Sequence, residues 1–304
     1  MLNDKNSAKI NKISKILIAL TAILTLLYLL SFTKSCSSSY KREKVKTALV
    51  NQKYKDTIKS FELSDSSGII EIINQGTFWS VGSVPASSER IENLIENLTK
   101  VRNLYKISDK ISNNSTFGLQ NGTEFHLRYY TDEGFHELIF GNQDFSLSSR
   151  YMMTEKSTQV YEVDSSLDTY LTTSIQSWAE PYIISHTASS SLDIQAISVT
   201  YKDSGGKIKT GNIKDSQKLL DLRHGGVPSE SEYQLAESTT PLAVLKIENG
   251  DKSSITVNIF QTDSQANSFL VKTQYFTPDS KSAYYTSYSK ISSWTYNKIK
   301  EITL

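Results

Sequence analysis

Cysteine is almost absent from this sequence, since Cys36 is the only one among 304 residues. A single thiol excludes a disulfide within the chain, and it does not distinguish an oxidising compartment from a reducing one. Cys36 lies just after a long apolar run, where the lipidated cysteine of a lipoprotein would lie. Lys34 and Ser35 precede it, although the position two residues before a lipidated cysteine is normally small and uncharged. The sequence therefore favours an unmodified cysteine beside the membrane over a lipidated one.

The chain also lacks an excess of charge of either sign, with 33 Lys and Arg residues against 32 Asp and Glu residues. Apart from four lysines within residues 5–15, basic residues gather only in the stretch from Lys34 to Lys46. Domains that bind nucleic acid usually carry a basic patch. The composition therefore argues against nucleic acid as a partner.

Charge is missing altogether from one stretch, Ile16 to Thr33, which follows four lysines at positions 5, 9, 12 and 15. As a helix, this stretch approaches the ~30 Å thickness of the hydrocarbon core of a bilayer. A cleaved signal peptide has a shorter apolar region of about 7–15 residues and ends in small residues. We therefore predict a cytoplasmic tail over residues 1–15, a transmembrane helix over 16–33 and a stalk over 34–53.

This arrangement places the protein at the cell membrane, with a single pass and an extracytoplasmic globular part. Lys and Arg residues are balanced on the two sides of the apolar run, so the positive-inside rule does not decide the orientation. An extracytoplasmic domain is the commoner outcome for a short N-terminal tail followed by a large domain, and we predict it for that reason.

The globular part begins with strand patterns. A hairpin is predicted from residues 58–63 and 68–73, and apolar residues at helical spacing between Ile91 and Tyr105 predict an amphipathic helix. Ser87 or Ser88 can cap this helix. Several strands follow, and apolar residues between Leu167 and Trp178 predict a closing helix.

From residue 192 the pattern restarts with a second hairpin. A short helix from Asp215 to His224, four strands and a last helix around Trp294 follow it. We therefore predict an α+β fold, in which the single transmembrane helix is followed by two similar mixed units of antiparallel sheet with packed helices. The units cover residues 54–186 and 192–304 and constitute an internal repeat.

Several structural motifs in the first half belong together: a strand leading to a proline, an amphipathic helix, an aromatic-Gly-Leu step, a glycine at a strand end, and tyrosines before the closing helix. They are Trp79-Ser80-Val81 with Pro85, Glu89 to Tyr105, Phe117-Gly118-Leu119, Gly141, Tyr151 and Val160-Tyr161. Over about residues 54–180 the chain thereby resembles a bacterial domain-of-unknown-function family of membrane-anchored extracytoplasmic proteins associated with gliding-motility-type ABC transporters. The resemblance implies an accessory domain beside a transporter, and it assigns no catalytic residue.

Residues that could take part in catalysis or metal binding are scattered along the sequence. His126 and His136 are placed to face each other across a predicted hairpin, with Glu133 and Glu137 nearby. A metal site needs three or four converging ligands, so we predict neither a metal site nor a cofactor. His224 falls in the last turn of a predicted helix, where a cation suits the helix dipole. Because no G-x-S-x-G elbow or phosphate-binding loop occurs, we predict no catalytic residue.

Clustered aromatic residues are the one feature that points to a binding surface. Tyr129 and Tyr130, and likewise Tyr284, Tyr285 and Tyr288, place rings on both faces of their predicted strands. Exposed rings can stack on glycans or hold a partner protein. Alternatively, one ring of each group is buried in the core and the others make cross-strand contacts.

Together these features predict a non-catalytic, membrane-anchored extracytoplasmic accessory or binding subunit of an ABC-transporter-type envelope system. Its expected partners are the membrane, through residues 16–33, and a membrane protein such as an ABC transporter. The alternative is an envelope glycan-binding protein or a hydrolase. An exposed row of rings around Tyr284 and Tyr288 would favour glycan binding, and a deep pocket joining a histidine to two carboxylates would favour hydrolysis.

Overall fold

The computed structural model describes residues 14–15, 17–25, 43–109, 114–119, 122–154, 157–189, 192–202, 207–212, 215–261 and 268–303. Residues 17–25 are helical and exposed. In these described ranges no helix is long and apolar enough to cross a membrane. The rest of the predicted span and Cys36 lie outside them. Residues 44–304 form one compact unit, separate from residues 1–43.

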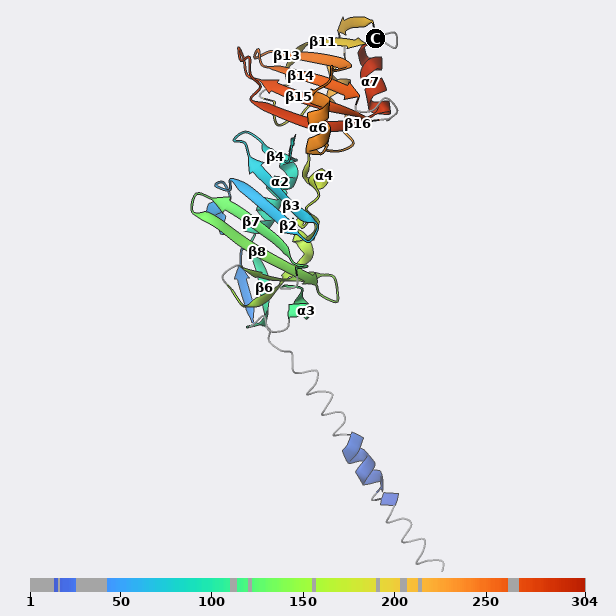
Figure 1. Ribbon diagram of the computed structural model, residues 1–304. Helices are drawn as coiled ribbons and strands as arrows, with labels where there is room; N and C mark the ends of the chain where they lie inside the picture. Colours follow the sequence, from blue (N-terminus) through green and yellow to red (C-terminus); the bar gives the residue numbers. More distant parts are fainter. Residues whose placement is uncertain are drawn as a thin grey trace, which may run out of the picture. The chain divides into compact units, whose positions relative to one another are not determined.

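An antiparallel sheet of ten strands, the first sheet, occupies the first half of this unit (Figure 1). Its strand order is β1-β6-β10-β9-β8-β7-β2-β3-β4-β5. The strands are β1 (Lys44–Thr47), β2 (Ser60–Asp65), β3 (Gly68–Asn74), β4 (Trp79–Val81), β5 (Val84–Pro85), β6 (Arg102–Ser108), β7 (Phe125–Thr131), β8 (Gly134–Gln143), β9 (Ser149–Thr154) and β10 (Val160–Asp164). Strand β1 falls in the segment assigned to the stalk, and the short helix η1 (Gln52–Tyr54) crosses its predicted end at residue 53.

The second sheet has six strands in the order β12-β11-β13-β14-β15-β16. They are β11 (Ile194–Lys202), β12 (Ile208–Asn212), β13 (Ala243–Asn249), β14 (Ser254–Gln261), β15 (Ser268–Phe276) and β16 (Tyr285–Ser292). The described helices of the compact unit are short: α2 (Ser88–Thr99), α3 (Asn114–Phe117), η2 (Ser165–Tyr170), α4 (Ile175–Trp178), α5 (Ser216–Leu220), α6 (Glu230–Glu237) and α7 (Ser293–Thr303).

The fold is therefore mostly antiparallel β-sheet with few helices, and the predicted α+β class was wrong. One cause is the predicted helix up to Trp178, which is broken into η2 and α4. Between them Ser174 N donates to Thr172 Oγ1 at 3.2 Å. Such local side-chain bonds compete with helix formation. The predicted helix up to Tyr105 likewise ends at Thr99, and Tyr105 lies in β6.

The two sheets nevertheless share part of their strand order. The run β3-β2-β7-β8-β9-β10 in the first sheet matches β12-β11-β13-β14-β15-β16 in the second. Each run consists of a hairpin followed by four strands, the first of which pairs with the first strand of the hairpin. The first sheet adds β4 and β5 at one edge and β6 and β1 at the other, so the sheets differ in size.

Helix α2 covers the inner face of the first sheet. Its apolar residues Ile91, Leu94 and Leu98 are fully buried in one cluster with Phe61 of β2 and Leu127 of β7. Ser87 caps the helix by accepting a hydrogen bond from Arg90 N, as predicted. Because side chains alternate along a strand, every second residue of β2, β3, β7 and β8 points to the other face.

Glu180 lies in the segment between the two sheets, and its buried carboxylate holds this segment in place. It accepts hydrogen bonds from Ser185 Oγ at 2.5 Å, Thr187 Oγ1 at 3.0 Å and His186 N at 2.8 Å. The backbone N–H of Glu180 donates to Pro85 O of β5. These bonds satisfy the buried charge and fix residues 180–187.

Gly141 of β8 provides a test of the packing at the outer face. A Cβ atom at this position would clash with the carbonyl oxygen of Phe117, which lies in α3. We expect Gly141→Ala to lower the free energy of unfolding by about 1–3 kcal/mol, because the backbone of α3 must move. The measurement is urea unfolding, with Gly225→Ala as the control. The nearest atom to a Cβ at Gly225 is 3.8 Å away, and equal effects of the two substitutions would contradict the prediction.

The ion pair of Glu232 in α6 can be tested through the pH dependence of stability. The hydrogen bond from Lys290 Nζ (2.7 Å) and those from Ser229 lower the pKa of Glu232 to about 2 from 4.5. Because the pKa is lower in the folded state, this stabilisation is complete above about pH 4.5 and is lost as the pH falls towards 2. The group is exposed, so its contribution is less than about 1 kcal/mol.

We therefore expect Glu232→Gln to lose less stability than the wild type between pH 6 and pH 3, measured by urea unfolding at both pH values. Glu230→Gln, in the same helix, is the matched control and should behave as the wild type. Identical pH dependence of the Glu232→Gln variant and the wild type would refute the assignment.

Candidate functional site

The outer face of β3, β2, β7 and β8, which we call the open face, carries most of the charged side chains of this part of the sheet. Glu71 of β3, Glu62 of β2, Arg128 of β7 and Glu137 of β8 lie in one row across the four strands. Their neighbours on the same strands are buried under α2, so strand alternation places these charges outward.

Arg128 holds this row together. Its Nη1 donates to Glu62 Oε1 at 2.7 Å and its Nε to Glu137 Oε1 at 2.7 Å. The same Glu137 oxygen lies 2.9 Å from Nδ1 of His126, and Tyr130 Oη donates to Glu62 Oε2 at 3.2 Å. The guanidinium is thus shared between two carboxylates, one bonded through Nη1 and the other through Nε.

Glu71 differs from the other carboxylates of the row. It lies directly opposite Glu62 in the antiparallel pair of β2 and β3, and its side chain is exposed. Like charges directly opposite each other destabilise a sheet. Arg128 reaches Glu62 but lies one strand further from Glu71, so the repulsion between the two glutamates is only partly relieved.

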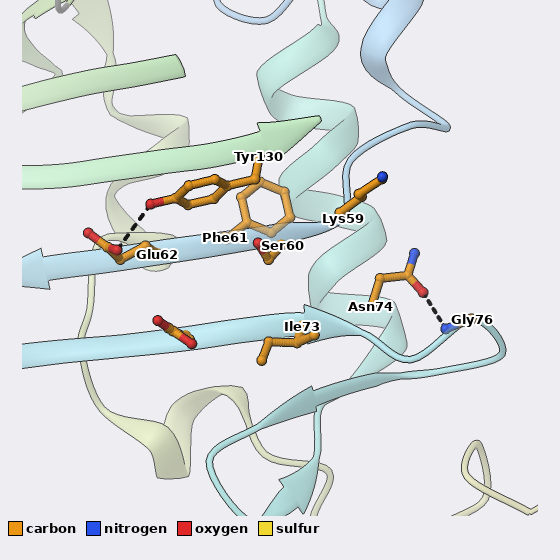
Figure 2. Close-up of a pocket in the computed structure, with 9 residues that line it drawn as sticks. Lys59, Ser60, Phe61, Glu62, Ile73, Asn74, Gly76 and Tyr130 are labelled. Carbon is orange, nitrogen blue, oxygen red and sulfur yellow. Dashed lines mark hydrogen bonds between the residues drawn. The ribbon is translucent and has the colours of Figure 1, made fainter. Parts of the chain in front are cut away.

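An open groove of about 670 Å³ lies on this face (Figure 2). It is lined by Lys59, Ser60, Phe61, Glu62, Glu71, Ile73, Asn74, Gly76 and Tyr130. Figure 2 shows the Tyr130 hydroxyl directed at Glu62, with Ile73 on the neighbouring strand. Burial and the adjacent Glu62 raise the pKa of Tyr130 above its usual value, so this phenol keeps its proton.

Large apolar side chains stand exposed around the groove. Ile69 is 68% exposed and Ile73 is 40% exposed, and they flank Glu71 on the same face of β3. Phe135 of β8 is 49% exposed and packs against Tyr130, with ring centroids 6.1 Å apart. Apolar groups beside charged ones on an open face are typical of a surface that contacts another molecule.

Tyr129 and Tyr130, the first two residues of the predicted binding surface, point to opposite faces of the sheet. Tyr129 lies in the core, 5% exposed, and burial raises its pKa to about 12. Tyr130 points to the open face and lines the groove. One ring of this pair is therefore buried and the other makes cross-strand contacts.

The three tyrosines near the C-terminus also have partners. Tyr284 is 43% exposed and its hydroxyl donates to Ala188 O, while the ring of Tyr285 packs edge-on against Phe78 at 4.7 Å. Tyr288 stacks on Tyr233 of α6 at 4.4 Å, and its hydroxyl donates to Glu237 at 2.5 Å. Helix α6, absent from the predicted elements, thus covers the ring of Tyr288.

The histidines do not converge. His126 is paired in register with Ile139 and His136 with Tyr129, so the two rings point to opposite faces of the sheet and the predicted juxtaposition was wrong. His136 stacks on Tyr129 at 4.9 Å. Among the residues that the structure describes, no group of three His, Cys, Asp or Glu side chains could hold a metal ion.

His224 also differs from the sequence interpretation. Helix α5 is capped by Asp215, as predicted, but it ends at Leu220. His224 therefore lies outside it and is buried, and its Nε2 donates to Glu180 O at 2.7 Å. Burial lowers its pKa, which favours the neutral ring. Its role is to hold the Glu180 segment rather than to complement a helix dipole.

The groove itself was missed from the sequence. Its signal is the alternation Ile69-Glu71-Ile73, which marks a strand with apolar and acidic side chains on one face and Ile70 and Ile72 on the other. Only the pairing of β3 with β2 and of β2 with β7 brings this row beside Glu62 and Tyr130.

Arg128 provides a test of the row. We expect Arg128→Met to lower the free energy of unfolding by about 1–3 kcal/mol, because two largely buried carboxylates lose their shared cation. The control is Lys59→Met, which removes an exposed pair with Asp132 and should cost less than about 1 kcal/mol. Urea unfolding of both variants measures the difference. An equal loss of unfolding free energy in the two would show that the row contributes no more than a surface ion pair.

Comparison with known proteins gives a family but no activity. Residues 79–249 match the family described as "Domain of unknown function (DUF4340)". The match runs from β4 to the end of β13 and thus extends beyond the region that the sequence motifs covered. No curated protein and no solved structure matches the chain. Since the match covers more than half of the 304 residues, the chain belongs to the DUF4340 family of domains of unknown function.

Proposed function

We propose that this chain is a non-catalytic accessory or binding subunit whose open face docks a partner protein. The observation that carries the proposal is the groove between β3, β2 and β7, with Ile69 and Ile73 exposed beside it. A solvated strand face would normally carry polar residues at these positions. Exposing two isoleucines is costly unless a partner covers them.

The chemistry of the open face supports binding over catalysis. Arg128, Glu62, Glu137 and His126 are bonded to one another, so these side chains are used in holding the row. A general base needs a hydrogen-bonding position towards a substrate. The alternative of a glycan-binding row around Tyr284 and Tyr288 has less support at Tyr288, because one face of that ring stacks on Tyr233, while Tyr284 is 43% exposed.

The partner we propose is a membrane protein of an ABC-transporter-type envelope system, with the globular part of this chain extracytoplasmic. Two features of the sequence support this partner. One is the resemblance to proteins associated with gliding-motility-type transporters. The other is the charge-free stretch from Ile16 to Thr33, which favours attachment at a membrane and would raise the local concentration of the domain near membrane partners.

The test is co-purification after mild crosslinking in native membranes. We expect the full-length chain to recover transporter subunits, and a chain lacking residues 1–33 to recover fewer. Ile73→Asp should reduce the recovery several-fold, because it places a charge in the apolar part of the docking face. The control is Ile208→Asp, on β12 of the second sheet, where the isoleucine is more exposed than Ile73 (68% against 40%). This variant should recover as much as the wild type.

Recovery of no transporter subunit by the full-length chain would overturn the proposed partner. Equal recovery by Ile73→Asp and the wild type would overturn the open face as the docking surface. In either case assays for glycan binding and hydrolysis follow.

A further inference from the structure

We infer that the groove of the open face receives a lysine or arginine side chain that is flanked by apolar residues in an extended segment of the partner. This inference rests on the proposed docking function and specifies its chemistry. It starts from the charge of the open face. Four glutamates, Glu62, Glu71, Glu124 and Glu137, lie on it or at its end. The cations beside them are Arg128, which Glu62 and Glu137 share, and Lys59, which lines the groove and pairs with Asp132. The chain as a whole is nearly neutral, so this face is acidic relative to the rest.

The cation has a defined place beside Glu71. Glu62 and Glu71 are direct neighbours across β2 and β3, and Arg128 and Tyr130 both donate to Glu62. A cation beside Glu71 would relieve the repulsion between the two carboxylates. It would also lie in the groove near the ring of Tyr130, where an aromatic ring adds to the attraction for an organic cation.

The surroundings of Glu71 select the kind of cation. Ile69 and Ile73 lie two residues before and after it on the same face of β3, and both are exposed. Lysine and arginine carry their charge on an aliphatic stem that packs on such side chains. A bare metal ion would gain nothing from them, and the described residues hold no group of three ligands for one.

The spacing on β3 specifies the partner segment further. The outward row reads apolar, acidic, apolar at every second residue, which is the period of an extended strand. A segment with apolar, basic and apolar residues at alternate positions matches this row in both charge and apolar contact. Such a segment would cover both isoleucines while its basic residue reaches Glu71.

The test is a titration of the full-length protein with two peptides by calorimetry. One is acetyl-Leu-Ser-Lys-Ser-Leu-amide, and the other has norleucine in place of lysine. We expect the lysine peptide to bind more tightly, and Glu71→Gln to weaken its binding by up to about fivefold, as expected for the loss of one exposed charge pair. Binding should also weaken as the salt concentration rises. The control Glu92→Gln changes an exposed glutamate of α2 and should leave the affinity unchanged.

Glu71→Gln should fold as the wild type does, because it removes a repulsion rather than a bond. An equal or slightly higher melting temperature checks this point. Equal affinity for the two peptides, or no change in affinity with Glu71→Gln, would overturn the inference.

The docking proposal and the cation inference can fail separately. If Ile73→Asp abolishes recovery of the transporter and Glu71→Gln leaves it intact, the docking face stands and the cation inference falls. If the full-length chain recovers no transporter but binds the lysine peptide through Glu71, the groove chemistry stands and the partner is a different protein.

Discussion

The need to bury the inner face of the first sheet under helix α2 determines where everything else on that sheet lies. Phe61, Leu127 and Leu94 are removed from water together, and the hydrophobic gain from such burial is the main force that stabilises a domain. Because side chains alternate along a strand, the residues between these buried ones must point to the opposite face. Glu62 and Arg128 point outward because their neighbours point inward, and the ion-pair row, the groove and the exposed isoleucines follow from this one constraint.

Carboxylates serve two distinct purposes in this protein. Glu180 is buried, and three donors from residues 185–187 bond to it, so its charge is satisfied inside the fold and fixes the segment between the sheets. Glu71 is exposed and faces another glutamate. The first arrangement stabilises the native structure by itself, whereas the second becomes favourable only when a positive charge arrives from outside. The contrast separates a structural group from a recognition group.

The two sheets share part of their strand order, but their outward charged residues have different partners. In the second sheet, helix α6 lies over the position of Tyr288, and Glu232 and Glu237 of that helix bond to Lys290 and Lys272. These glutamate and lysine side chains thereby form ion pairs within the chain instead of with a partner. In the first sheet, α3 covers the outer side of β8 and β9 around Ile139 and Met153. It leaves Glu71 exposed and Tyr130 half-buried at the groove.

Much of the local structure was predictable. The hairpin of β2 and β3, the strands β13 to β16, and the caps at Ser87 and Asp215 follow from period-two patterns and capping residues that act over a few positions. Predictions that extended such patterns too far failed. Apolar spacing alone continued one helix to Tyr105, and it joined η2 and α4 into another. The resulting balance of helix and strand gave the wrong fold class.

The sequence alone determined the charge-free stretch at the N-terminus, the near-neutral composition and membership of a family of unknown function, because these depend only on the order of residues. Only the tertiary structure decided which face each residue occupies across strands. His126 and His136 are separated in this way, and Glu62, Glu71 and Tyr130 are brought together from three strands. The physical reason is that strand register is set by burial of the whole sheet face, which involves residues far apart in the chain.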